Sequence, residues 1–171
     1  MSRFKDFTIS TPRPLPVIVL ADISGSMSVD GKIDVLNASI SDMARDFASQ
    51  DDRRGEIMVA VIAFGGESAH VVQAPVPARD FRWQAMEADG RTPLGSALVM
   101  VRELLDDRDQ IPSRAYRPTL ILVSDGQPND EWEEPLRALL GSERASKAFR
   151  VAVAIGADAD RSDKAETESA A

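Results

Sequence analysis

The stretch VIVLADISGSM (residues 17–27) changes character in its middle. Its first part, residues 17–21, is a continuous apolar run rich in β-branched side chains. This is the pattern of a strand that is buried on both faces of a parallel sheet. The run ends at Asp22, and the hydroxyls of Ser24 and Ser26 follow at alternate positions. These three residues either form a capped turn, since Asp, Ser and Gly are common turn formers, or hold a ligand together.

Strands and helices alternate along the rest of the chain. Further strands are predicted at residues 57–64, around 70–72, 119–123 and 151–155, and amphipathic helices over 33–47, over 94–105 and from about Glu131. Such alternation implies right-handed crossovers and a mostly parallel sheet that helices cover on both sides. The glycine pair after residues 57–64 predicts a hairpin, which makes 70–72 an antiparallel edge strand. We therefore expect a three-layer α/β/α sandwich.

The composition excludes several classes of function. Hydrophobic residues make up 43% of the chain and charged residues 28%, as in an ordinary soluble protein. The sequence has no cysteine and a single histidine, His70, which removes thiolate chemistry and most enzyme mechanisms that work at neutral pH. Its 28 acidic residues against 20 basic ones give a formal charge of -8, which opposes binding to nucleic acid and to anionic membranes. Because no segment resembles a signal peptide or a membrane span, we expect a cytoplasmic protein.

The chain is predicted to hold one globular domain over residues 15–156. Residues 1–14 are expected to form an extended arm, because Pro12 and Pro14 disfavour a helix there. Residues 157–171 contain no large apolar side chain, so we expect a disordered polar tail.

Two carboxylates are predicted to meet at one edge of the sheet. In open parallel sheets, ligands bind outside the carboxyl ends of the strands. Asp22 ends the first strand and Asp125 ends the third buried strand, while Ser24, Ser26 and Thr92 add hydroxyls. Oxygen ligands without histidine or cysteine suit a hard cation, and a site with few charges and several hydroxyls suits Mg²⁺ better than Ca²⁺. We expect Mg²⁺ here, with Mn²⁺ and Ca²⁺ as the alternatives.

Three separated segments resemble one known family. The segments DISGSM (22–27), TPLGSAL (92–98) and VSDGQPND (123–130) are similar to the three elements of the metal-ion-dependent adhesion site (MIDAS) of von Willebrand factor type A (vWA) domains. The resemblance covers residues 15 to about 156 and implies a Rossmann-like vWA fold. It also implies metal ligation by the corresponding residues here, namely Asp22, Ser24, Ser26, Thr92 and Asp125. Among bacterial members, the sequence looks most like the TerY-like branch, which is associated with tellurium resistance and stress-response operons.

The resemblance implies a binding module that is not an enzyme. In such a module a partner protein supplies an acidic side chain that completes the coordination of the metal. By resemblance to TerY-like proteins, partners would include kinase-like, phosphatase or other tellurium-resistance proteins. The strongest alternative is a Mg²⁺-dependent aspartyl-phosphate phosphatase-like enzyme that uses Asp22. The haloacid-dehalogenase pattern, however, requires a second Asp two positions on, where this chain has Ser24.

The end of the sequence departs from the family pattern. A full vWA domain continues after AIG (154–156) with a helix, a strand and a last helix, and we expect these elements to be missing here. Truncation, completion by another chain and a minimal variant remain open as explanations. If the sheet ends at residues 151–155, that strand is an unprotected edge that favours self-association or strand addition.

Some polar and aromatic residues near these segments also have ordinary explanations. Thr92 is alternatively an N-cap before Pro93, and Asp130 is expected to cap the helix that starts at about Glu131. Asn129 and Asp130, with Asp30, are explained by turn or cap roles, although a further cation site or polar rim is the alternative. We assign His70 no role, and we expect Trp83 and Trp132 to pack against the core.

Overall fold

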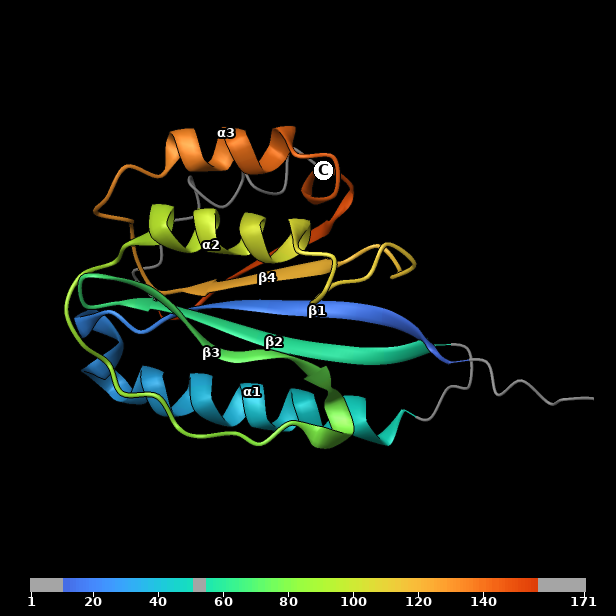
Figure 1. Cartoon of the computed structure of the whole chain (residues 1–171). Coiled ribbons are helices and arrows are strands. Elements are labelled where there is room, and N and C mark those ends of the chain that lie inside the picture. Colours follow the sequence, from blue (N-terminus) through green and yellow to red (C-terminus); the bar gives the residue numbers. More distant parts are fainter. Residues whose placement is uncertain (1–10, 51–54, 157–171) are drawn as a thin grey trace, which may run out of the picture.

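A five-stranded sheet forms the centre of the computed structural model, which describes residues 11–50 and 55–156 (Figure 1). The strands are β1 (Arg13–Asp22), β2 (Gly55–Gly65), β3 (Ser68–Pro77), β4 (Thr119–Ser124) and β5 (Phe149–Ala154). The α-helices are α1 (Lys32–Ser49), α2 (Leu94–Asp106) and α3 (Glu133–Gly141). Short 3-10 helices occur at η1 (Gly25–Gly31), η2 (Ala78–Asp80) and η3 (Ala145–Lys147).

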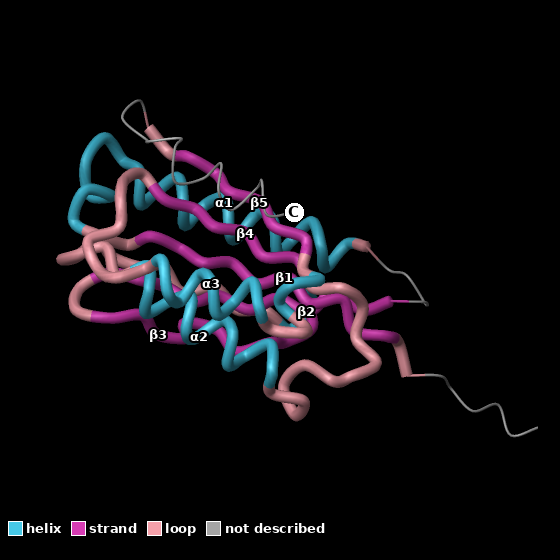
Figure 2. Tube along the Cα trace, turned by 90° about the horizontal axis from the view of Figure 1, so that it is seen from above, coloured by secondary structure: helices cyan, strands magenta, loops and turns pink. Residues whose placement is uncertain are grey.

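The strand order β3-β2-β1-β4-β5 confirms the predicted architecture. β1 pairs in parallel with β2 and β4, β4 pairs in parallel with β5, and only β3 runs antiparallel, at one edge. Helices α2 and α3 cover one face of the sheet and α1 covers the other (Figures 1 and 2). The fold is therefore a three-layer α/β/α sandwich with a mostly parallel sheet.

The central strand β1 contributes to both hydrophobic cores. Ile18 and Leu20 belong to the core under α2 and α3, whereas Val19 and Ala21 belong to the core against α1. Successive side chains of a strand point to opposite faces, so a strand between two layers of helices must be apolar at every position. The uninterrupted apolar run before Asp22 meets this requirement.

β1 begins earlier than the apolar run predicted, because its prolines fall where no ladder bond is needed. The strand starts at Arg13 and includes Pro14 and Pro16, while its pairing with β4 begins only at Val17. The carbonyl of Pro14 accepts a hydrogen bond from the Tyr116 amide on the β4 side (2.7 Å). In a parallel ladder the N–H and C=O of one residue point to the same side, so the missing N–H groups of both prolines lie beyond the paired part of β4.

The far edge strand, β5, leaves part of its apolar surface open to solvent. Phe149 is 54% exposed and Val153 is 41% exposed, and β5 pairs only with β4 among the described strands. An edge strand with apolar side chains is a site for pairing with another chain. Self-association through this strand stays a prediction, which a concentration series in the analytical ultracentrifuge tests.

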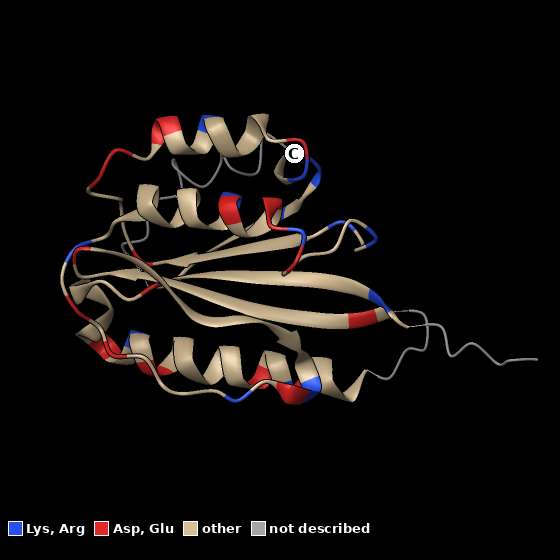
Figure 3. Cartoon of the chain, in the orientation of Figure 1, with Lys and Arg blue, Asp and Glu red and all other residues tan. Residues whose placement is uncertain are grey.

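Charged residues lie mostly on helices, in loops and at the ends of strands (Figure 3). Within the described residues, no helix has the length and apolar character needed to cross a membrane. The predicted tail (157–171) lies outside the described residues. The same is true of residues 1–10 of the predicted arm (1–14).

Candidate metal centre

The carboxyl ends of the parallel strands meet at one edge of the sheet, on the left in Figure 1. Asp22 is the last residue of β1, and Asp125 directly follows the last residue of β4. The two residues are almost fully buried, at 0% and 4% exposure. A buried carboxylate is costly unless hydrogen bonds or opposite charges stabilise it, so the partners of these two residues define the site.

Neutral donors hold both oxygens of the Asp22 carboxylate. Oδ1 accepts the backbone N–H of Ser24 (2.8 Å), and Oδ2 accepts the hydroxyl of Ser124 (2.7 Å). In the described part of the chain, Asp22 takes part in no ion pair. The Asp22 carboxyl group is thus buried with two hydrogen bonds and without an ion pair among the described residues.

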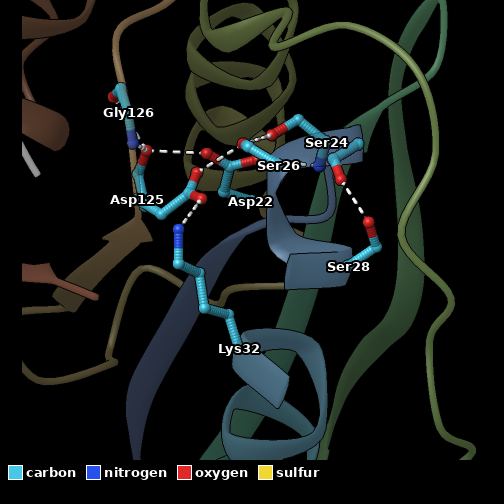
Figure 4. A network of polar contacts seen from close by, with 9 residues as sticks. Asp22, Ser24, Ser26, Ser28, Lys32, Asp125 and Gly126 are labelled. Atoms are coloured by element: carbon cyan, nitrogen blue, oxygen red, sulfur yellow. Dashed lines mark hydrogen bonds and ion pairs between the residues drawn. The ribbon is translucent and has the colours of Figure 1, made fainter. Parts of the chain in front are cut away.

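Hydroxyl groups connect this carboxylate to the second one (Figure 4). The Ser26 hydroxyl donates to Asp125 Oδ1 (2.8 Å) and lies 3.1 Å from the Ser24 hydroxyl. The other oxygen of Asp125, Oδ2, forms an ion pair with Lys32 Nζ at 2.9 Å. The structure therefore brings Asp22, Ser24, Ser26 and Asp125 together as the sequence predicted, and it adds Lys32.

The first loop takes this shape because its apolar residues anchor it in the core against α1. Ile23 and Met27 are buried at 8% and 0% exposure, and the Met27 amide donates to the carbonyl of Ser24 (2.9 Å). The Ser28 hydroxyl donates to the carbonyl of Gly25 (2.7 Å), which closes the same turn. The alternation of apolar and polar residues thus directs the two serine hydroxyls of the motif away from the core.

Backbone contacts fasten the loop before Thr92 to the first loop. The Gly25 amide donates to the Gly90 carbonyl (2.9 Å), and Gly90 forms an isolated bridge with Gly66. Gly90 has a positive φ of 65°, and a Cβ at this position would lie 2.5 Å from the Cα of Gly66. Only glycine fits this crossing of two backbones without a shift.

Thr92 belongs to this edge, and its alternative role as an N-cap is wrong. Helix α2 begins at Leu94 with Pro93 at its N-cap position and has no side-chain cap bond. Thr92 is 9% exposed, and its hydroxyl makes no hydrogen bond among the described residues. Its backbone is fixed by Asn129, whose side-chain oxygen accepts the Thr92 amide (2.9 Å) and whose amide donates to the Thr92 carbonyl (3.1 Å). Thr92 is thus a nearly buried residue with a fixed backbone, and its hydroxyl accepts or donates no hydrogen bond within the described part of the chain.

Asp130 caps a different helix from the one predicted. Its carboxylate accepts the amides of Gly95 (3.0 Å) and Ser96 (3.1 Å) in the first turn of α2. Helix α3 begins only at Glu133 and has no side-chain cap bond. The prediction that Asp130 caps the helix from about Glu131 is therefore wrong, because close packing of the two helix starts places α2 nearer to the carboxylate. A Cβ on Gly95 would lie only 2.2 Å from the Glu131 carbonyl oxygen, which shows how close that packing is.

The remaining residues singled out in the sequence lie elsewhere. His70 is exposed on the edge strand β3. Trp83 packs against the core on the α1 side and stacks on Phe81, with ring centroids 5.7 Å apart. Trp132 packs against the other core and lines, with Thr92, an apolar cavity of about 50 Å³.

Sequence reasoning missed two residues of the site, Ser124 and Lys32. Ser124 directly precedes Asp125, so its position at the strand end was a usable signal. Lys32 stands in a polar stretch before a helix, and nothing in its local pattern indicates that it turns back toward Asp125.

Comparison with known proteins identifies the family. Residues 17–127 match the model of the von Willebrand factor type A domain, and the chain belongs to this family. Its human relative inter-alpha-trypsin inhibitor heavy chain H6 is 30% identical over 168 residues, which cover 87% of this chain and 12% of that protein. An uncharacterized protein of Mycobacterium tuberculosis is 28% identical over 114 residues, which cover 65% of this chain and 17% of that protein. The chain thus spans less than a fifth of the length of these two curated relatives.

Solved structures share the fold. Proximal thread matrix protein 1 from the mussel byssus superposes with a TM-score of 0.66 at 18% identity, covering 91% of this chain and 41% of that one. A second structure of that protein, with a zinc-occupied MIDAS motif, gives a TM-score of 0.65 at 16% identity and the same coverage. The pilus adhesin SpaC from Lactobacillus rhamnosus GG gives 0.53 at 17% identity, covering 68% of this chain and 15% of that one.

The donor set of this edge fits a divalent cation. Two buried carboxylates lie beside the hydroxyls of Ser24 and Ser26, and these groups offer oxygen, the ligand that Mg²⁺ prefers. Thr92, which directly precedes Pro93 and α2, adds a further hydroxyl from the neighbouring loop. Within the described residues, no three His, Cys, Asp or Glu side chains gather as a potential metal cluster. The ammonium of Lys32 on Asp125 shows that this edge attracts positive charge.

Proposed function

We propose that this vWA domain is a metal-dependent protein-interaction module. In this proposal Asp22, Ser24, Ser26, Thr92 and Asp125 hold a divalent cation, with Mg²⁺ first and Mn²⁺ or Ca²⁺ as alternatives. The bound cation would supply an electrophilic coordination position for an acidic side chain of a partner protein. The single observation that carries the proposal is the Asp22 carboxylate, fully buried among neutral donors and without an ion pair in the described residues.

Two proteins of similar structure support a binding role. A structural neighbour carries zinc in its MIDAS motif, which adds Zn²⁺ to the ions that require testing, and another neighbour is a pilus adhesin. From the resemblance to TerY-like proteins, we further propose a cytoplasmic tellurium-resistance or stress-response system as the setting. Kinase-like, phosphatase or other tellurium-resistance proteins are the proposed partners.

We propose no catalytic role for this site. An aspartyl-phosphate enzyme needs a nucleophilic carboxylate and a second acidic group that moves protons. Here both oxygens of Asp22 accept hydrogen bonds, Ser24 stands at the position of the second acid, and Asp125 is paired with Lys32. These contacts favour a carboxylate pair that holds a cation over one that attacks a substrate.

The test compares the protein with the variant Asp22→Asn, which removes one charge and keeps the size of the side chain. Calorimetric titration with Mg²⁺ should give a binding signal for the wild type and none for the variant. Asp46→Asn serves as the matched control, because this exposed residue lies in the second half of α1, away from the site. Equal Mg²⁺ affinity in all three proteins would contradict the assignment of the metal ligands.

A second measurement tests the interaction itself. In a pull-down from cell lysate, the wild-type protein is the bait in Mg²⁺ and in chelator, and Asp22→Asn is the bait in Mg²⁺. A partner that is captured only in the first condition supports the metal-bridged contact, whereas equal capture in all three removes it. Metal-dependent hydrolysis of a phosphomonoester that Asp22→Asn abolishes would instead favour the phosphatase alternative.

A further inference from the structure

Lys32 places a positive charge inside the candidate metal centre (Figure 4). Its Nζ lies 2.9 Å from Asp125 Oδ2, and the two side chains are only 16% and 1% exposed. Exposed ion pairs contribute little to stability because water screens them, but a pair as shielded as this one interacts strongly. The ammonium therefore neutralises one of the two carboxylates at this edge.

The backbone before α1 directs this side chain to its position. Asp30 and Gly31 both adopt left-handed conformations, with φ values of 55° and 68°, and they are the last two residues of η1, directly before α1. The chain turns sharply there, and Lys32 becomes the first residue of α1 beside Asp125. Besides glycine, Asp and Asn adopt the left-handed conformation most readily, so Asp30 and Gly31 suit this turn.

The other side of the lysine is bounded by the chain after β5. A Cβ added to Gly156 would lie 2.9 Å from Lys32 Cε. The Ile155 amide donates to the Ser124 carbonyl (3.0 Å), which fixes that segment next to the strand end that carries Asp125. The lysine side chain is thus confined between Asp125 and Gly156, and its ammonium stays near the carboxylate.

The charges show what this arrangement does to a divalent cation. Asp22 and Asp125 carry two negative charges, and Lys32 returns one positive charge. Without a metal, the lysine reduces the repulsion between the two buried carboxylates. With a divalent cation on the same carboxylates, the ammonium and the ion repel each other at short range in a shielded site.

We infer that Lys32 is a built-in competitor of the metal. It stabilises the metal-free site and weakens the affinity for divalent cations. The site therefore needs a higher free cation concentration to bind metal than it would need without the lysine. The inference rests on the proposed metal-binding function of the same site. A purely structural ion pair would stabilise the fold without changing metal affinity, and this difference is measurable.

The test replaces the ammonium and keeps the aliphatic stem. In Lys32→Met, calorimetric titration should show Mg²⁺ binding about tenfold tighter or more than in the wild type, because the repelling charge is gone. In chelator, the same variant should unfold at a lower temperature than the wild type, because the two carboxylates then repel without compensation. Lys32→Gln, which can still donate a hydrogen bond to Asp125, should show the same gain in affinity with a smaller loss of metal-free stability.

Lys147→Met is the matched control. It removes the same charge from an exposed lysine that pairs with Glu143 (3.9 Å) just before β5, at the opposite end of the sheet. Its Mg²⁺ affinity should equal that of the wild type, which excludes a general effect of net charge.

The possible results separate the two hypotheses. If the wild type binds Mg²⁺ and neither Lys32 variant binds it more tightly than Lys147→Met, the competitor role is overturned and the metal-binding function stands. If only the Lys32 variants bind Mg²⁺, the competitor role is supported in its strongest form. If none of the four proteins binds a divalent cation, the proposed function fails and the inference fails with it.

Discussion

The two edges of the sheet stabilise buried or half-buried charges in opposite ways. At the edge formed by the amino ends of the parallel strands, here called the arginine edge, arginines donate to main-chain carbonyls. Arg144 Nη2 lies 2.8 Å from the Ile111 carbonyl, and Arg150 Nη1 lies 3.1 Å from the Ala145 carbonyl. At the edge where the strands end, here called the carboxylate edge, Asp22 and Asp125 accept hydrogen bonds from two hydroxyls, a backbone amide and the ammonium of Lys32.

The difference separates structural charges from functional ones. A guanidinium that donates to carbonyls fastens a loop, and those carbonyls need donors in any case. Burial, together with the charge of Arg117, lowers the pKa of Arg150, and the Ala145 carbonyl accepts a hydrogen bond from this desolvated side chain. Hydroxyls, in contrast, can turn their lone pairs toward a cation, so the edge with Asp22 keeps the capacity to bind one.

The largest expected effect concerns the backbone crossing at the carboxylate edge. Gly90→Ala forces a Cβ to within 2.5 Å of Gly66 Cα and places alanine at a positive φ. We expect the free energy of unfolding to fall by about 2–4 kcal/mol and Mg²⁺ affinity to fall with it, because strain at this crossing separates the loops of the site. Urea denaturation and calorimetry measure the two quantities.

Gly141→Ala is the control for this change. Gly141 ends α3, has no atom within 4 Å of an added Cβ and lies outside the site. Its replacement should leave Mg²⁺ affinity unchanged and stability equal or slightly higher, because alanine favours the helix. A Gly90→Ala protein as stable as Gly141→Ala would show that the crossing tolerates a side chain.

The sequence was sufficient for the fold because its strongest signals are local. The apolar run before Asp22 predicts a central strand by itself, and the same is true of the strands around it. Two carboxylates that each follow a parallel strand must meet at one edge, so Asp22 and Asp125 were predictable without a structure. The start of β1 was not predictable from the sequence, because it depends on where β4 begins to pair with β1.

The errors arose where a residue's partner is distant in the sequence. Asp130 has the pattern of a cap for the helix that follows it, but it caps α2, where it accepts the amide of Gly95, 35 residues earlier in the chain. Lys32 reaches a carboxylate 93 residues away through a left-handed turn at Asp30 and Gly31. Local propensity contains no information on either contact, because tertiary packing decides both.

The next prediction concerns the contact between Asp130 and α2. Asp130→Ala leaves the amides of Gly95 and Ser96 without their acceptor. We expect a loss of about 2 kcal/mol in the free energy of unfolding, at the upper end for a helix cap, and weaker Mg²⁺ binding because Thr92 lies just before α2. Asp130→Asn keeps an acceptor and should lose less than half as much. Equal stability of the wild type and the alanine variant in urea denaturation would show that water replaces the cap.

A smaller effect is expected at the arginine edge. Arg144→Met removes the hydrogen bonds to the carbonyls of Ile111 (2.8 Å) and Pro112 (3.2 Å) and keeps most of the apolar stem. The free energy of unfolding should fall by about 1 kcal/mol, which is the usual net contribution of an intramolecular hydrogen bond. Mg²⁺ affinity should stay at the wild-type value, since this edge holds no metal ligand in our proposal. A change in affinity comparable to that of Asp130→Ala would remove the distinction between the two edges.

The smallest expected effect comes from an exposed carboxylate at the same arginine edge. Hydrogen bonds from the Gln110 side chain and the Asp109 amide lower the pKa of Asp107, which follows the last turn of α2. Because the folded-state pKa is depressed, the contribution to stability is present above the unfolded pKa of about 3.9 and disappears as the pH falls through the lower folded value. The urea midpoint of Asp107→Asn should therefore lie slightly below that of the wild type at neutral pH, and the two should converge in acid. Asp46→Asn, which removes a charge on α1, controls for net charge. If the difference in urea midpoint between the two proteins persists unchanged into acid, the effect comes from the shape of the turn. The charge of Asp107 would then contribute nothing to stability.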